Sequence, residues 1–169
     1  SLLAGVNYLD ITGELEVIEF AAQQHDRALA AGISLMPAVG FDVVPSDCLA
    51  ARLADALPTA TDLELAFTAG LSMSPGTAKT MLTVSGDGGR VRADGQIIRV
   101  PTAWQTMQIA FPSGTRQAVT IPWGDVSSAF HTTRIPNIRV YTVMPRKQFR
   151  FLRRWRWLLP MAKLAPVQW

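Results

Sequence analysis

A strand–helix–strand pattern at the start of the chain limits the possible folds more than any later segment. Residues 33–39 form a nearly continuous apolar run, which is typical of a strand buried on both faces of a parallel sheet. Residues 6–11 form a shorter β-rich run, and residues 14–31 between the two show helical spacing, with Thr12 as a plausible N-cap and Gly32 as the stop. The pattern therefore predicts a right-handed βαβ crossover.

The remaining segments predict a different kind of sheet. A helix is expected to begin at Ser46, with an apolar stripe at Leu49, Leu53 and Leu57. Alternating strands are expected at residues 63–67, 90–93, 96–100, 107–111, 119–123 and 138–144, with a short helix at residues 76–85. The dipeptide Asp94-Gly95 is a strong signal for a two-residue hairpin turn.

We therefore expect an α/β fold in which the end of a Rossmann-type parallel βαβ domain is followed by an α+β domain. The second domain is expected to hold a mixed, mainly antiparallel sheet. The predicted organisation is the C-terminal part of a dinucleotide-binding domain at residues 1–45, a substrate and dimerisation domain at residues 46–145, and a basic-aromatic tail at residues 146–169.

Composition and charge restrict the function classes. Of the 169 residues, 49% are hydrophobic and 17% charged, enough for a real core. The longest mostly apolar stretch, residues 32–41, is too short to span a membrane, and no basic segment precedes an apolar one at the start, so we expect a cytoplasmic protein. A single cysteine excludes an internal disulfide framework and a Cys-rich zinc site, and we expect no metal.

Charge is divided unevenly along the chain. Residues 1–125 contain all 13 acidic residues and 7 basic ones, and residues 126–169 contain 9 basic residues and no acidic one. Residues 146–169 interleave these cations with aromatic rings, as in Arg150, Phe151, Arg153 and Trp155. Such a segment can contact an anionic membrane surface peripherally, bind a partner, or pack against further protein, whereas nucleic acid is the least favoured ligand.

Four blocks of sequence carry a resemblance to a known family. They are YLDITGE at residues 8–14, GFDVVPSDC at residues 40–48, SPGTAKT at residues 74–80 and IPWGDV at residues 121–126. Together, and in this order, they resemble the saccharopine dehydrogenase-like oxidoreductases, most closely the branch that includes bacterial trans-acting enoyl reductases.

The resemblance implies an N-terminal Rossmann domain that binds NAD(P), followed by an α/β substrate and dimerisation domain. It also implies that this chain is the middle and C-terminal portion of a protein about twice as long. The phosphate-binding G-x-G-x-x-G of such a domain does not occur in the sequence, and the GDGG at residues 86–89 is interpreted as a turn. The chain alone is therefore expected to bind a dinucleotide weakly or not at all, and to be inactive without the N-terminal half of such a protein.

Two segments are candidates for cofactor contact. Gly40, Phe41, Asp42 and Pro45 follow the second predicted parallel strand, and ligands of open α/β sheets bind beyond the carboxyl ends of the strands. Asp10 ends the other predicted parallel strand and could orient the nicotinamide or the substrate. The structural alternative is a plain interdomain hinge, with Thr12 capping the following helix.

Substrate binding and catalysis are assigned to two further segments. Gly76 and Thr77 at a predicted helix start suit a carboxylate, phosphate or thioester oxygen, and Lys79 could polarise a carbonyl or donate a proton. Trp123 is a candidate substrate contact, and His131 is a candidate proton donor that Asp125 could orient. A solvated lysine and a structural histidine are the alternatives.

These assignments lead to two functional hypotheses. The first is part of an NAD(P)-dependent reductase that transfers hydride to an acyl or lipid-like substrate, or to an imine or carbonyl. The second is a non-catalytic module that forms a homodimer through its antiparallel sheet and contacts a membrane or partner through residues 146–169.

Overall fold

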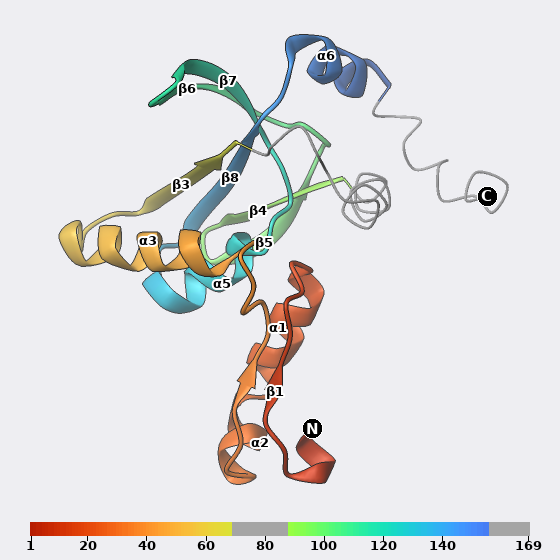
Figure 1. The fold of residues 1–169 in the computed structure, drawn as a ribbon, viewed down its shortest axis with the longest axis vertical. Helices are drawn as coiled ribbons and strands as arrows, with labels where there is room; N and C mark the ends of the chain where they lie inside the picture. Colours follow the sequence, from red (N-terminus) through yellow and green to blue (C-terminus); the bar gives the residue numbers. More distant parts are fainter. Residues whose placement is uncertain (69–87, 156–169) are drawn as a thin grey trace, which may run out of the picture. The chain divides into compact units, whose positions relative to one another are not determined.

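The protein has a mixed α/β structure with a mainly antiparallel sheet (Figure 1). A computed structural model describes residues 1–68 and 88–155. The chain divides into two compact units. The first comprises Ser1–Leu63, Arg92–Ile97 and Trp123–Ile138, and the second comprises Glu64–Val91, Ile98–Pro122 and Arg139–Trp169. No helix within the described ranges has the length and apolar character needed to cross a membrane.

The first unit begins with a parallel strand pair. After a 3-10 turn, η1 (Leu2–Ala4), strand β1 (Tyr8–Leu9) pairs in parallel with β2 (Leu35–Met36), placing Tyr8 opposite Leu35. Two helices, α1 (Leu15–Gln23) and α2 (His25–Ala30), connect the strands in place of the single predicted helix. The prediction of one helix is wrong at Gln24, whose N–H bonds to the Ala21 carbonyl three residues back and so tightens the turn.

Both parallel strands are shorter and more exposed than the apolar pattern predicts. The run at residues 33–39 yields a strand of two residues, and Met36 within it is exposed, as is Leu9 on β1. The expectation of a strand buried on both faces is therefore wrong for this chain. The reason is that the described residues contribute just these two strands to the parallel sheet, so neither face is covered as in a complete α/β domain.

Two helices pack together in the rest of the first unit. Helix α3 (Val44–Ala56) contacts α5 (Asp125–Thr133), a helix that the sequence pattern did not reveal. The fully buried residue of α3 is Ala50, whereas the predicted stripe of Leu49, Leu53 and Leu57 is exposed. That prediction is wrong because close approach of two helices favours a small residue at the contact.

The start of α3 also differs from the prediction. The helix begins at Val44 rather than after Ser46, with Pro45 in its first turn, where the missing proline N–H leaves no donor unsatisfied. The Ser46 hydroxyl donates to the Val43 carbonyl at 2.9 Å instead of capping the helix.

A six-stranded sheet forms most of the second unit, and the ends of four of its strands belong to the first. Its strands are β3 (Asp62–Phe67), β4 (Gly89–Ala93), β5 (Gln96–Val100), β6 (Thr106–Phe111), β7 (Gly114–Thr120) and β8 (Asn137–Val143). The strand order is β5-β4-β8-β7-β6, and β3 also pairs with β8. This central position explains why Ile138, Val140 and Tyr141 on β8 are almost completely buried.

Two local predictions for this sheet are confirmed. Asp94 and Gly95 both have positive φ, 48° and 78°, as a two-residue hairpin turn between β4 and β5 requires. Strands β6 and β7 pair antiparallel across the turn at residues 112–113, with Phe111 opposite Gly114. Helix α6 (Arg146–Trp155) follows β8 and buries Phe149 against Ala103 and Val119.

Candidate active site of the first unit

Asp10 links the carboxyl ends of the two parallel strands of the first unit through hydrogen bonds. Its Oδ1 accepts hydrogen bonds from the N–H of Thr12 at 2.9 Å and of Ala38 at 3.0 Å, and its Oδ2 accepts from the Tyr8 hydroxyl. The Asp10 carbonyl also accepts from the Val39 N–H at 2.8 Å. The segments that leave β1 and β2 are therefore held side by side.

These hydrogen bonds also set the charge of Asp10. Partial burial alone would raise its pKa, but the bonds from the Tyr8 hydroxyl and from the N–H groups of Thr12 and Ala38 outweigh it and hold the pKa below its usual value. The shared bond correspondingly raises the pKa of Tyr8. Both oxygens of the carboxylate accept hydrogen bonds within the chain, so Asp10 holds the ends of the two strands in place.

The segment after β2 passes closely over the segment after β1. A Cβ placed on Gly40 would lie 3.1 Å from Ile11 Cβ, so the side-chain-free residue allows this approach. The next residue, Phe41, leaves 89% of its surface exposed. The Asp42 carbonyl accepts a hydrogen bond of 2.8 Å from Trp123 Nε1, which ties this segment to one much later in the chain. Pro45 lies in the first turn of α3, and its ring restricts the backbone where the chain leaves the strand pair and enters this helix.

Residues 123–125 pack against the same edge. A Cβ on Gly124 would lie 2.7 Å from Val43 Cγ2 and 3.5 Å from the Gly13 carbonyl oxygen, so the α5 start is in direct contact with both strand-end segments. Asp125, the first residue of α5, is 1% exposed. The sequence predicted Trp123 and Asp125 as site residues, and the structure brings both to the segment that contains Gly40 and Asp42.

Burial gives Asp125 an unusual pKa. Loss of solvent raises the pKa of this carboxyl to about 6, against a smaller lowering by the neighbouring Ser46 hydroxyl, and the nearby Asp47 carboxylate raises it further. Within the described part of the chain, Asp125 Oδ1 has no hydrogen-bond partner.

His131 belongs to a separate polar cluster of the first unit. Its Nε2 lies 3.7 Å from Glu19 Oε1, and the same oxygen accepts from Arg92 Nη2 at 2.6 Å and from Ser127 Oγ at 2.7 Å. The carboxylate beside His131 is thus Glu19 on α1, whereas Asp125 lies beside Ser46. Six residues of helix, about 9 Å, separate His131 from Asp125 along α5.

Sequence reasoning did not identify Glu19 or Arg92. The Arg92 side chain is 5% exposed, and it also donates to the carbonyls of Val126 and Gly95. Its guanidinium carbon lies 4.1 Å from the centre of the Phe130 ring. One sequence feature could have pointed to Arg92. It lies on a strand next to the apolar Val91 and two residues before the Asp94-Gly95 turn.

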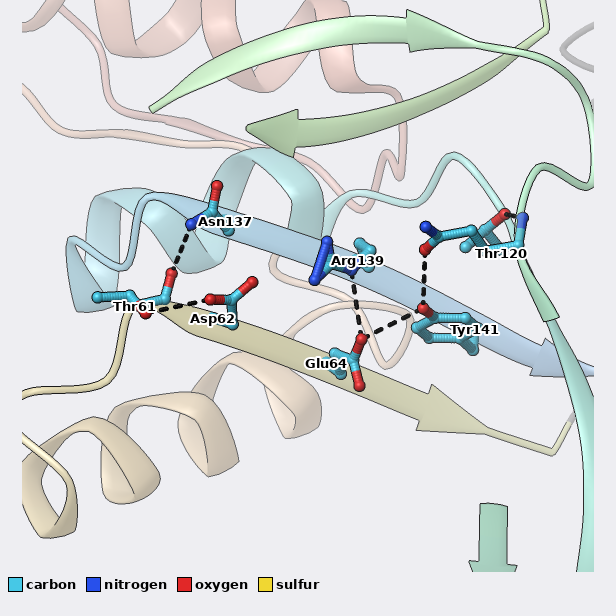
Figure 2. Close-up of polar contacts among 8 residues, drawn as sticks. Thr61, Asp62, Glu64, Thr120, Asn137, Arg139 and Tyr141 are labelled. Atoms are coloured by element: carbon cyan, nitrogen blue, oxygen red, sulfur yellow. Dashed lines mark hydrogen bonds and ion pairs between the residues drawn. The ribbon is translucent and has the colours of Figure 1, made fainter. Parts of the chain in front are cut away.

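The second unit contains a further polar group on its sheet, shown in Figure 2. Glu64 Oε1 on β3 accepts from Arg139 Nε at 3.2 Å and from the Tyr141 hydroxyl at 3.3 Å, and that hydroxyl lies 3.4 Å from Gln105 Oε1. Burial, together with the Glu64 carboxylate, raises the pKa of Tyr141. The phenol is therefore a proton-bearing donor at neutral pH, and no sequence motif marked it.

The three remaining predicted site residues, Gly76, Thr77 and Lys79, lie outside the described residues. Across residues 1–68 and 88–155, no group of three or more His, Cys, Asp or Glu side chains is arranged to hold a metal ion.

In comparisons with known proteins, no family model matches this chain, and no curated protein matches it significantly.

Proposed function

We propose that this chain is part of an NAD(P)-dependent oxidoreductase similar to the saccharopine dehydrogenase-like proteins. Its βαβ segment is, in this proposal, the end of a Rossmann-type domain, and the second unit belongs to the substrate domain. The reaction is hydride transfer to an acyl or lipid-like substrate, or to an imine or carbonyl.

One observation carries the proposal: three of the four sequence blocks that suggest the family meet in space. Residues 8–14 contribute Ile11, whose Cβ would lie 3.1 Å from a Cβ on Gly40 of residues 40–48. Residues 40–48 also contribute Asp42, which accepts from Trp123 of residues 121–126. More than a hundred residues separate the first block from the last. Their meeting point is the carboxyl edge of a parallel strand pair, where open α/β sheets bind ligands.

The exposed apolar surface around the parallel pair supports the Rossmann assignment. Side chains of the strands and their connecting helices face solvent, namely Leu9, Ile11, Phe20, Leu29 and Met36. Parallel sheets normally have both faces covered and contain more than two strands. Such a surface is expected where further strands and helices complete the sheet, as the proposed domain requires.

The residues at this edge fit the nicotinamide end of a dinucleotide. The Phe41 ring is 89% exposed and offers a stacking surface for a planar ring. When bound, the dinucleotide would supply the hydride. The chain lacks a glycine-rich phosphate loop, so its own residues contact the nicotinamide end and leave the pyrophosphate to another segment.

Proton supply in this proposal involves residues outside the edge itself. Asp125 is buried, so it acts as a positioning residue that anchors the Trp123 segment. His131, half exposed beside Glu19, and Lys79 are the two candidate donors to the reduced substrate.

The proposal is tested with the protein encoded by the complete open reading frame around this sequence. We expect an upstream segment with G-x-G-x-x-G after a strand, and oxidation of NADPH or NADH with an enoyl thioester, imine or ketone. Phe41→Ala should raise the KM for the reduced dinucleotide about three- to ten-fold, as expected for loss of one ring-stacking contact. Phe151→Ala, which removes an exposed ring on α6, should leave that KM unchanged.

Catalytic roles are separated in the same assay. Lys79→Ala or His131→Ala should lower kcat without changing the KM for the dinucleotide. A start codon directly before Ser1, or failure of the intact protein to bind either reduced dinucleotide, would refute the assignment.

A further inference from the structure

Helix α6 in the second unit carries its cations on one face. Five of its ten residues are basic, and none is acidic: Arg146, Lys147, Arg150, Arg153 and Arg154. At 100° per residue, the five positions fall within an arc of about 120°. All five side chains are exposed, so the arc presents a continuous cationic stripe to solvent.

A face beside this stripe fixes the helix to the protein. Phe149 is 9% exposed and packs with Ala103 and Val119, and Met144 packs against the same cluster. Arg153 lies 6.0 Å from the Phe149 ring centre, on the solvent side of this contact. The helix is therefore held in place, and its cationic stripe has a defined orientation on the second unit.

A hollow of about 350 Å³ extends the cationic surface beyond the helix. Its polar and basic lining comes from β6, β7 and the start of α6: Gln108, Thr115, Arg116, Gln117 and Arg146. Val143, Met144 and Pro145 form the apolar remainder of its wall. Two guanidinium groups and several amide and hydroxyl donors around one hollow form a set that suits a phosphate group.

We propose that α6 and this hollow bind an anionic membrane surface, with lipid phosphates at the arginines and the Phe151 ring at the headgroup level. Phe151 follows the cationic stripe around the helix and is 62% exposed. Aromatic rings beside a row of cations suit the boundary between headgroups and acyl chains. This inference does not depend on the proposed oxidoreductase activity.

Charge along the chain supports a lipid surface as the occupant. Residues 126–169 contain no acidic residue, so this segment contributes no carboxylate that would repel a negatively charged layer. The residues after α6 add Arg156, Trp157 and Lys163, which continue the basic and aromatic composition. A flat anionic layer can engage a stripe of five exposed cations and a neighbouring ring at the same time.

The test is co-sedimentation of the full 169-residue chain with vesicles. Vesicles of phosphatidylcholine alone are compared with vesicles of phosphatidylcholine and phosphatidylglycerol in equal parts. We expect binding to the anionic vesicles, weakened by added salt. Arg150→Gln/Arg154→Gln should weaken that binding about thirty-fold, because each cation near the surface contributes independently. Arg27→Gln/Arg52→Gln removes the same charge from the first unit and should leave binding unchanged.

The aromatic contact has its own matched pair of variants. Phe151→Ala should weaken binding even at a salt concentration that screens the charges, whereas Phe20→Ala, which removes a ring of similar exposure (63%) from α1, should have no effect. Circular dichroism of each variant shows that the fold is retained.

Three results would overturn the inference. The first is equal binding to both kinds of vesicle, and the second is equal loss of binding in the two arginine double variants. The third is binding of a single-stranded oligonucleotide, or of free glycerol phosphate, that competes fully with the anionic vesicles, because this would identify a soluble phosphate ligand instead.

Discussion

Replacement of Arg92 by methionine is the most informative single test of how the first unit is held together. The side chain is 5% exposed and makes four contacts. Its Nε and Nη1 donate to the carbonyls of Val126 and Gly95 at 2.9 and 2.6 Å, its Nη2 pairs with Glu19 at 2.6 Å, and its guanidinium carbon lies 4.1 Å from the Phe130 ring centre.

The expected loss follows from these contacts. Methionine fills much of the aliphatic volume but leaves two carbonyls without a donor, at about 1 kcal/mol each. Loss of the contact with the Phe130 ring adds about 0.5 kcal/mol. The ion pair with Glu19 adds about 1 kcal/mol rather than more, because Glu19 is 32% exposed and water screens it. We therefore expect the free energy of unfolding to fall by about 3.5 kcal/mol.

Urea denaturation at neutral pH, followed by tryptophan fluorescence, measures this change. Arg139→Met is the control, because Arg139 pairs with Glu64 on a more exposed surface and should cost about 1 kcal/mol or less. Adding Glu19→Gln to Arg92→Met should cost less than the sum of the single variants, since it removes the carboxylate left without its cation. Equal losses for Arg92→Met and Arg139→Met would refute the assignment of Arg92 as a buried anchor.

Three further predictions concern the edge of the parallel pair and the hairpin. Gly124→Ala should destabilise the protein by about 1–3 kcal/mol in urea denaturation, because its Cβ would lie 2.7 Å from Val43 Cγ2, whereas Gly13→Ala meets no atom within 4 Å and should change stability little. Folding raises the pKa of Asp125 from 3.8 to about 6, so the native state binds its proton more tightly. The unfolding free energy should therefore fall by about 3 kcal/mol as the pH rises through that interval, and Asp125→Asn should abolish this component. If the two proteins show the same pH profile, Asp125 is not buried as described. Asn137→Ala removes a donor to the Thr61 carbonyl at 2.9 Å and an acceptor for the Asp94 N–H at 3.0 Å, and should lower the thermal midpoint by an amount equivalent to about 2 kcal/mol; no shift would show that neither bond contributes.

The parts of the fold that local residue patterns control were predictable. The hairpin at Asp94-Gly95 follows from the positive φ that both positions adopt, and the alternation at residues 63–67 follows from the two-residue period of a strand with one buried face. The buried face of α3 was not predictable, because Ala50 is buried by its contact with α5, a helix about seventy-five residues later.

The candidate site shows the same division. From the sequence, Asp10, Gly40 and Asp42 were predicted as cofactor contacts, Trp123 as a substrate contact and Asp125 as the residue that could orient His131. Their contacts were visible only in the structure. Asp10 accepts hydrogen bonds that hold two segments together, and Asp125 lies beside Ser46.

Local sequence specifies the strand period of the sheet, the hairpin turn and the concentration of positive charge after residue 125. These properties depend on neighbouring residues, whose spacing is set by the backbone. The position of Glu19, rather than Asp125, beside His131 and Arg92 follows from the packing of α1 against later segments. The ion pair forms because segments distant in the sequence pack together, and a local residue pattern does not specify which segments pack together.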